Sequence, residues 1–501
     1  MRLAHASRLP IAVLLAALAG LLAQGQASAS TPEAAPDPRF DRVAAVVQGQ
    51  MKALGVPGAA LGILADGRVH TRGFGVTNID HPLPVTDDTL FQIGSISKTF
   101  TGTAIMRLAE QGKLRLDDPI RKYLPHFAVN DADASSRATV RDTLTHMGGW
   151  EGDFFDDPSS GDDALEQIVE RMGRLEQTAK VGEMWGYNNA GFYAAGRIIE
   201  VVTGKPFERA LRELVLDPIG IDRAYLFPAE VMTHRFVVGH GAPKGVARVL
   251  TPWPIPRAAN AAGGITTDVA SMLRYAAFHM GDGTSAAGTR VLSASSLAQM
   301  RATAAPKTGS DLTMGLTWHL SRAGNLAVAE HSGVTNGQIS HLWLVPERRF
   351  AIAVVTNSDR GDTLNTQVIR AAMDAYLGVV TPRPARMVVA ADALAEYAGT
   401  YRRQYADVTV TVDGDALKFQ ETPKMPGLDL QIPPQGPPQR LAFFEKDRLL
   451  LVDGPNAGEP GGEFVRDASG RVSWLRTEDW QRADFGTGRI HRRIPTPTGT
   501  P

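Results

Sequence analysis

The sequence of 501 residues contains no cysteine, and this absence removes several kinds of chemistry. No disulfide, zinc–thiolate site or iron–sulfur site can form, and no cysteine can act as a nucleophile. Covalent catalysis would therefore depend on Ser, Thr, Lys, Tyr, His or a carboxylate. An excess of either charge is also lacking, with 52 Lys and Arg against 53 Asp and Glu. Because nucleic-acid binders carry a concentrated basic surface, we expect no nucleic-acid partner.

Long apolar runs are lacking except at the N-terminus. Arg2 and Arg8 precede an apolar stretch from Leu9 to Leu22, which is followed by Ala27-Ser28-Ala29. This order of charged, apolar and small residues is typical of a secretory signal peptide. The alternative is a membrane anchor, but the run is shorter than the roughly 20 residues that a spanning helix needs. We therefore predict a signal peptide over residues 1–29, an exported protein that is periplasmic or secreted, and no membrane span after cleavage.

The remaining chain divides into two unequal units, of which residues 39–378 form the first. The turn dipeptide Asp66-Gly67 between two apolar runs predicts a β-hairpin over residues 59–75. Helical periodicity fills the middle of this unit, and strand patterns return near residue 316. The expected helices span residues 39–54, 91–112, 140–145, 164–174, 190–203, 207–216, 268–279 and 363–377, and the later strands span 316–320, 326–329, 338–345 and 350–357. One antiparallel sheet drawn from both ends, with flanking helices and an all-helical region, predicts an α+β fold (an α/β sandwich).

A second unit follows a Pro-rich segment. Thr381-Pro382-Arg383-Pro384 indicates a linker, which we place over residues 379–392. Turn pairs such as Asp413-Gly414 then separate short apolar runs, a spacing that predicts a small all-β barrel or sandwich over residues 393–492. The expected strands span residues 408–412, 417–419, 441–444, 449–452, 463–465 and 472–476. Residues 493–501 are expected to form a flexible tail.

The candidate chemistry lies in the segment Phe91-Gln-Ile-Gly-Ser-Ile-Ser-Lys-Thr-Phe-Thr-Gly102. A helix that begins near Ser95 would place Lys98 one turn further along, within reach of the Ser95 hydroxyl. Serine is a weak nucleophile that needs an adjacent base, and a lysine serves when its surroundings keep the amine neutral. A Ser-x-x-Lys tetrad by itself arises easily by chance in a chain of this length. The residues around the tetrad must therefore show whether it is functional.

That context resembles the serine β-lactamase and penicillin-binding-protein superfamily, in its class C, esterase and D-aminopeptidase branch. The segment around Ser95 is similar to the first motif of this branch, and Tyr187-Asn188-Asn189 is similar to its Y-x-N motif. His331-Ser332-Gly333 stands at the position of the third motif, which is K-T-G in lactamases. The three motifs occur in the expected order, and the resemblance covers about residues 40–378. More loosely, Leu394 to Tyr401 resembles the start of the lipocalin-like barrel domain that is appended to such hydrolases.

The resemblance implies roles for the residues of the first two motifs. Ser95 would attack an acyl carbonyl, Lys98 would take its proton, and Tyr187 would relay a proton to the leaving group. Asn189 would orient the substrate amide. It could also cap the helix that begins at Ala190, and both roles can hold together.

The resemblance also implies that the third motif helps to form an oxyanion hole and helps to bind a substrate carboxylate. The hole would use the backbone N–H groups of Ser95 and of Val334, which follows Gly333. His331 departs from the lactamase pattern, which has a lysine there. Because histidine is mostly neutral at pH 7, a clamp for a substrate carboxylate is weakened unless a neighbour raises the histidine pKa.

The resulting hypothesis is an exported serine hydrolase that acts through an acyl-enzyme on Ser95. It would cleave amide or ester bonds of small or peptide substrates of the D-amino-acid type, peptidoglycan-derived peptides among them. No metal and no cofactor are implied. The alternatives are a true β-lactamase, which the histidine disfavours, and a catalytically weak penicillin- or peptidoglycan-binding protein. The sequence leaves open whether the barrel covers the site or only docks beside it.

Overall fold

The computed structural model describes residues 36–241, 246–306, 313–424, 437–454, 456–479 and 484–495. The predicted signal peptide and residues 496–501 of the predicted tail lie outside the described residues. One unit, Pro38–Pro501, contains both the central sheet with its helices and the C-terminal barrel.

The central sheet draws its strands from both ends of the first predicted unit. Its order is β2-β1-β13-β12-β11-β10-β9-β8, and neighbouring strands are antiparallel. The predicted hairpin is confirmed, because β1 and β2 join at Asp66 and Gly67, whose φ angles of 52° and 72° suit a tight hairpin turn. The strands span β1 Gly58–Ala65, β2 Arg68–Gly75, β8 Ala305–Pro306, β9 Thr313–Met314, β10 His319–Ala323, β11 Leu326–Thr335, β12 Gln338–Val345 and β13 Phe350–Thr356.

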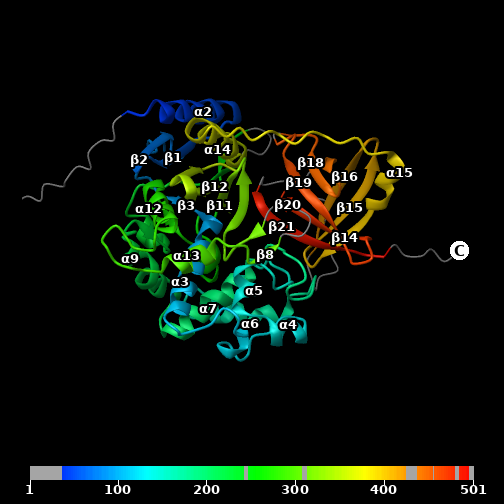
Figure 1. Cartoon of the computed structure of the whole chain (residues 1–501), viewed down its shortest axis with the longest axis horizontal. Helices are drawn as coiled ribbons and strands as arrows, with labels where there is room; N and C mark the ends of the chain where they lie inside the picture. The colour runs from blue at the N-terminus through cyan, green and yellow to red at the C-terminus, as the bar shows by residue number, and fades with distance from the viewer. Residues whose placement is uncertain are drawn as a thin grey trace, which may run out of the picture. The chain divides into compact units, whose positions relative to one another are not determined.

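Helices cover both faces of this sheet. Figure 1 shows α2 (Pro38–Leu54) beside α14 (Gly361–Leu377), and both pack on one face, while α12 (Val269–Met280) packs on the other. Strand β1 is consequently buried on both sides, with Leu61 facing α2 and α14 and Ala60 facing the α12 side. The predicted α/β sandwich is confirmed.

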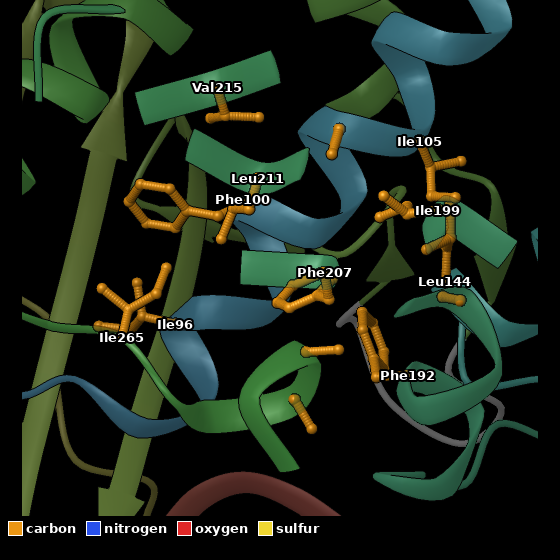
Figure 2. Packing of buried hydrophobic residues seen from close by; sticks show 14 of the residues in the cluster. Ile96, Phe100, Ile105, Leu144, Phe192, Ile199, Phe207, Leu211, Val215 and Ile265 are labelled. Atoms are coloured by element: carbon orange, nitrogen blue, oxygen red, sulfur yellow. The ribbon is translucent and has the colours of Figure 1, made fainter. Parts of the chain in front are cut away.

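The helical region packs around α3 (Ser97–Glu110), the helix that follows the first motif. Figure 2 shows labelled side chains of α3, α7 and α8 that belong to one apolar core, with Ile96 beside Ile265. The other helices span α4 Ala132–Arg137, α5 Val140–Leu144, α6 Ala164–Glu170, α7 Ala190–Thr203, α8 Phe207–Leu211, α9 Asp217–Ile219, α10 Pro228–Val231, α11 Asn260–Gly263 and α13 Ala294–Met300. In the described part of the chain, no helix combines the length and the apolar character needed to cross a bilayer.

Two predicted starts were wrong, and the strand predicted over 326–329 extends through the third motif to Thr335. The helix predicted over 91–112 begins only at Ser97, because Phe91–Gln92 forms strand β3, which pairs with β7 (Thr266–Thr267), and a 3₁₀ turn intervenes. The strand predicted over 316–320 begins at His319, because the chain turns at Thr317, whose φ is 69°. Remaining short strands are β4 Ala224–Tyr225, β5 His240–Gly241 and β6 Arg248–Val249.

The C-terminal strands form a closed barrel in the order β14 to β21. Its interior is filled by aromatic and aliphatic side chains, Tyr401 and Phe464 among them. The strands span β14 Gly399–Arg403, β15 Ala406–Asp413, β16 Ala416–Pro423, β17 Gln439–Glu445, β18 Arg448–Leu451, β19 Pro460–Arg466, β20 Val472–Asp479 and β21 Asp484–Arg493. The last strand therefore includes Arg493, which was assigned to the tail.

Six of these strands, β15 to β20, were predicted, whereas β14 and β21 were not. The two missed strands close the barrel by pairing with each other at Tyr401 and Arg493. Their sequences, GTYRR and DFGTGRIHRR, are rich in glycine and arginine and lack the apolar alternation that indicates a strand.

Helix α14 is joined to the barrel by a bidentate ion pair. Arg370 donates from Nη1 and Nη2 to the two carboxylate oxygens of Glu459, each at 2.6 Å. The Glu459 side chain is 7% exposed, and Arg383 of the linker lies 3.4 Å from its Oε1. Thr363 of the same helix donates to Asn456. The buried Glu459 carboxylate of the barrel is therefore paired with Arg370 of helix α14, which packs on the central sheet.

We predict that Arg370→Gln loosens this contact. Glu459 would keep only the more distant Arg383, so the free energy of unfolding should fall by about 1–3 kcal/mol. Urea denaturation and limited proteolysis of the 379–390 linker measure the effect. Arg386→Gln, a substitution within the linker, is the control. Its partner Asp415 is 62% exposed, so this ion pair should contribute little to stability. Equal effects of the two substitutions would contradict the prediction.

Candidate active site

The first motif forms a turn directly before α3. Ser95 lies in the 3₁₀ turn Gly94–Ile96, and Lys98 lies in the first turn of α3 with its side chain fully buried. The Lys98 Nζ atom is hydrogen-bonded to Ser95 Oγ at 2.9 Å and donates to the Ala262 carbonyl at 2.8 Å. The predicted proximity of serine and lysine is therefore confirmed, and the amine is placed to take the serine proton.

Aromatic rings enclose the lysine amine. Lys98 Nζ lies 5.0 Å from the ring centroid of Tyr187 and 5.4 Å from that of Phe192. Ring faces attract an ammonium group, whereas burial disfavours its charge. These rings and the Ala262 carbonyl hold Nζ against the Ser95 hydroxyl.

Tyr187 is positioned by a histidine and by the barrel. Its ring stacks on the His146 ring, with centroids 4.5 Å apart and an interplanar angle of 25°. His146 has a left-handed backbone with φ of 59°, and its Nδ1 accepts a hydrogen bond from Asn188 N at 2.9 Å. On strand β21, the Gly488 carbonyl accepts a hydrogen bond from Tyr187 N at 2.9 Å. The tyrosine is thus held by both parts of the unit.

Asn189 lines the cavity at Ser95, while its neighbour Asn188 caps helix α7. Asn188 Oδ1 accepts a hydrogen bond from Gly191 N at 2.7 Å and caps α7, whereas the Asn189 side chain makes no capping bond. Asn189 instead lines the cavity at Ser95, with its Nδ2 3.5 Å from Asp153 Oδ1. Of the two roles left open by the sequence, the side-chain cap is not observed.

Two glycines let strand β11 approach the turn that contains Ser95 closely. A Cβ on Gly333 would lie 1.9 Å from the Ile93 carbonyl oxygen and 2.7 Å from Ser95 N. A Cβ on Gly94, whose φ is 50°, would lie 2.6 Å from Val334 N. Neither position can hold a side chain without displacing backbone. Both Ser95 and Val334 line the cavity, which suits the predicted oxyanion hole.

His331 is buried rather than placed on the cavity wall. It is 2% exposed, its Nδ1 lies 2.5 Å from the Ser332 carbonyl oxygen, and its ring centroid lies 5.0 Å from that of His319 and 6.5 Å from that of Tyr187. The histidine therefore lies beside the tyrosine, and it is not among the residues that line the cavity. Within the described ranges, no group of three or more His, Asp or Glu residues is arranged to hold a metal ion.

A cavity of about 300 Å³ opens at Ser95. Its lining combines apolar residues with polar and charged ones, and three of the lining residues belong to the barrel. Its lining consists of Ser95, Asp153, Phe155, Tyr187, Asn189, Ile255, Pro256, Ala259, Ala262, Gly263, Val334, Thr335, Arg403, Tyr405 and Arg489. The barrel therefore forms part of the site, which answers the question that the sequence left open.

The turn between β14 and β15 is docked on the first part of the unit. Gln404 Oε1 accepts from Glu176 N at 3.0 Å, and its Nε2 donates to the Arg174 carbonyl at 3.1 Å. These two bonds fix the residues on either side of Gln404, which are Arg403 and Tyr405, against the cavity.

Two barrel arginines of this lining lie near two carboxylates, those of Asp153, which also lines the cavity, and of Glu151, which does not. Arg489 donates from Nε to Asp153 Oδ2 at 2.6 Å, and Arg403 Nη1 lies 3.5 Å from Asp153 Oδ2 and 3.6 Å from Glu151 Oε1. Burial alone would raise the pKa of Asp153, but the charges of Arg489 and Arg403 outweigh burial and lower it. Burial raises the pKa of Glu151 above its ordinary value.

Sequence reasoning missed these residues. Arg403 and Arg489 lie on the two unpredicted barrel strands, where a charged residue resembles an ordinary solvent-facing one. Asp153 follows the Gly148-Gly149 pair in a segment without regular structure, and no spacing links it to Ser95. Only the packing of the barrel on this segment brings them together.

Comparisons with known proteins place the chain in a family. The family model described as Beta-lactamase matches residues 43–377. Penicillin-binding protein 4 of Amycolatopsis lactamdurans is 34% identical over 361 residues, which cover 70% of this chain and 94% of that protein.

Solved structures show the same fold. The crystal structure of SurE with D-Leu has a TM-score of 0.69 at 25% identity and covers 91% of this chain and 99% of that one. D-amino acid amidase from Ochrobactrum anthropi SV3, complexed with D-phenylalanine, has a TM-score of 0.59 at 23% identity and covers 68% and 99%. The match to SurE is longer than the family-model match and so extends into the barrel. The chain belongs to the beta-lactamase and penicillin-binding-protein superfamily of serine hydrolases.

Proposed function

We propose that this protein is an exported serine hydrolase that cleaves amide or ester bonds of small D-amino-acid-type substrates through an acyl-enzyme on Ser95. The observation that carries the proposal is the 2.9 Å contact between Ser95 Oγ and the buried Lys98 Nζ at the edge of a cavity. A serine needs such an adjacent base to act as a nucleophile near neutral pH.

The proposed reaction proceeds in two halves. Lys98 takes the proton as Ser95 Oγ bonds to the substrate carbonyl carbon, and the resulting oxyanion receives hydrogen bonds from backbone N–H groups of Ser95 and Val334. The bond to the leaving amine or alcohol breaks, and the leaving group takes a proton relayed through Tyr187. Water then attacks the ester on Ser95, which releases the acid and restores the hydroxyl.

The substrate class rests on cavity size and on relatives. A cavity of about 300 Å³ lies at the lower end of the range of small-molecule sites, which favours small acyl groups. SurE was crystallised with D-Leu, and the amidase was crystallised with D-phenylalanine. By analogy we extend a D-amino-acid substrate, such as a peptidoglycan-derived peptide, to this chain.

The first prediction from this proposal concerns Ser95 as the nucleophile. A fluorophosphonate probe should label the wild type, and Ser95→Ala should lose all labelling because the attacking oxygen is gone. Ser97→Ala is the matched control, because the Ser97 hydroxyl is buried and accepts a hydrogen bond from Ile265 N at 3.0 Å. Intact-protein mass spectrometry measures the adduct. Equal labelling of the wild type and Ser95→Ala would exclude Ser95 as the nucleophile.

The second prediction separates the proposed hydrolase from two alternatives, a true β-lactamase and a weak binding protein. Turnover of a D-alanyl anilide or p-nitrophenyl butyrate should exceed that of nitrocefin, because His331 is buried beside Tyr187 and offers no fixed cation at the cavity wall. Steady-state kcat/KM values for the three compounds provide the measurement. Efficient cleavage of nitrocefin alone would establish a β-lactamase. Probe labelling without turnover of any compound would indicate a binding protein.

Export remains part of the proposal and rests on the N-terminal sequence alone. Expression of the full chain in a bacterial host should yield a mature protein whose N-terminus lies near Ser30, recovered from the periplasm or the medium. Mass spectrometry of the N-terminal peptide in each cell fraction is the measurement, and a variant with Arg2 and Arg8 replaced by Glu is the control. Recovery of an uncleaved chain in the cytoplasm would contradict export.

A further inference from the structure

A histidine occupies the position after helix α5 where glycine is the usual residue. His146 is the second residue after this helix, and its backbone is left-handed with φ of 59°. Met147 N donates to the Asp142 carbonyl at 3.0 Å, a hydrogen bond typical of helices that end in a left-handed residue. Glycine and sometimes asparagine adopt this conformation readily, whereas other residues adopt it at a cost in free energy. The end of the helix explains the backbone of His146 but not its side chain.

The carbonyl and the side chain of His146 both bind the segment that contains Tyr187. The His146 carbonyl accepts a hydrogen bond from Gly186 N at 3.1 Å, and His146 Nδ1 accepts one from Asn188 N at 2.9 Å. Between these two bonds, Tyr187 N donates to the Gly488 carbonyl at 2.9 Å. Three consecutive N–H groups are thereby fixed, two of them by one residue. The backbone on both sides of the tyrosine therefore depends on His146.

The imidazole ring of His146 lies against the phenol ring of the same tyrosine. The two centroids are 4.5 Å apart at an interplanar angle of 25°, and His146 is fully buried. The rings of Trp185 and Phe192 also lie beside the imidazole, with centroids at 5.9 and 5.4 Å. Because protein interiors are close-packed, a ring enclosed in this way keeps its orientation. The imidazole plane therefore restricts the plane of the Tyr187 ring, and with it the direction of the Tyr187 hydroxyl.

The hydrogen bond from Asn188 also sets the protonation of the imidazole. Asn188 N is a donor, so His146 Nδ1 accepts and carries no proton. The neutral ring then carries its proton on Nε2, whereas an imidazolium would bring two N–H donors face to face. Lys98 Nζ already lies 5.0 Å from the Tyr187 ring centroid. His146 thus packs an uncharged ring against a tyrosine that lies beside a lysine amine.

We propose that His146 is a positioning residue for Tyr187, which acts by directing the Tyr187 hydroxyl toward the leaving group of the substrate. This inference rests on the proposed function, in which Tyr187 relays a proton to that group. A histidine supplies a flat ring and an acceptor nitrogen together, and a glycine at this helix end would supply neither. Costly backbone conformations persist at functional sites where the side chain serves the reaction, and His146 fits that pattern.

The competing interpretation is that His146 only ends helix α5 and fills the core. Loss of its ring would then lower stability, and it would lower all activities in the same proportion. A positioning role makes the loss depend on the leaving group instead, because 4-nitrophenolate departs as an anion whereas an alkoxide needs a proton. Two esters that share an acyl group therefore separate the two interpretations.

The test compares 4-nitrophenyl butyrate with ethyl butyrate on the full chain. Both esters form the same acyl-enzyme on Ser95, so their kcat/KM values differ only through the steps that lead to it. His146→Asn keeps an acceptor near the position of Nδ1 and suits the left-handed backbone, but it removes the ring. Its kcat/KM for ethyl butyrate should fall about ten- to a hundredfold further than that for the 4-nitrophenyl ester. Titration of the released acid measures both reactions.

Two further variants make the comparison specific. His279→Asn is the matched control, because His279 is also fully buried and its ring lies beside those of Tyr275 and Trp318, with centroids at 4.5 and 5.2 Å. This substitution should lower Tm and leave the ratio of the two kcat/KM values at its wild-type level. His146→Phe keeps a ring and removes the acceptor, and it should also lower the ratio. If circular dichroism shows that His146→Asn fails to fold, His146→Phe provides the measurement.

Tyr187→Phe completes the test, because it removes the relaying hydroxyl itself. A selective loss on ethyl butyrate in both Tyr187→Phe and a folded His146 variant would support the inference. A folded His146 variant with the wild-type ratio, beside a selective loss in Tyr187→Phe, would overturn it and leave the proposed function intact. If Tyr187→Phe lowers both esters equally while a fluorophosphonate probe still labels Ser95, the proton relay fails and the role of His146 fails with it. If Ser95 is not labelled and neither ester is cleaved, the proposed function itself fails together with this inference.

Discussion

The site depends on one buried contact, that between the amine of Lys98 and the hydroxyl of Ser95. A lysine amine inside a protein must be given polar partners, because an unpaired buried polar group is costly. The Ala262 carbonyl and the ring faces of Tyr187 and Phe192 meet that requirement. Helix α3 is anchored in the largest apolar core (Figure 2), which keeps the lysine from moving away. The second motif and the helical region are therefore arranged around this amine.

The barrel forms part of the cavity at Ser95 and is more than an appendage beside it. It contributes a carbonyl to the backbone of Tyr187, two hydrogen bonds through Gln404, and three side chains to the cavity wall. Its inner core is separate from the cores of the sheet and the helices, and it meets the first part through these polar contacts and through a small apolar cluster in which Val465 joins Ala179 and Met184. The polar contacts fix the orientation of the barrel through their geometry, and Arg403 and Arg489 thereby line the same cavity as Ser95.

Much of the fold follows from local pattern, and the exceptions have physical causes. The hairpin at Asp66-Gly67 and the helix Ala190–Thr203 were predicted, because turn residues and apolar periodicity are local signals. Strands β14 and β21 were missed, because barrel closure over a long sequence separation stabilises segments whose own sequences are rich in glycine and charge. His331 was expected at the cavity and is buried, since its position on β11 packs it against His319 and near Tyr187.

The sequence by itself determined the contact between Ser95 and Lys98, because the two residues lie within one helical turn of each other and local geometry brings them together. It also determined the order of the three motifs and the antiparallel sheet that both ends of the first unit build. The tertiary structure alone decided what surrounds the substrate cavity. Asp153 precedes Arg403 by 250 residues and Arg489 by 336, and they meet because a closed barrel docks on a loop. Charges brought together across such separations leave no periodic trace in the chain.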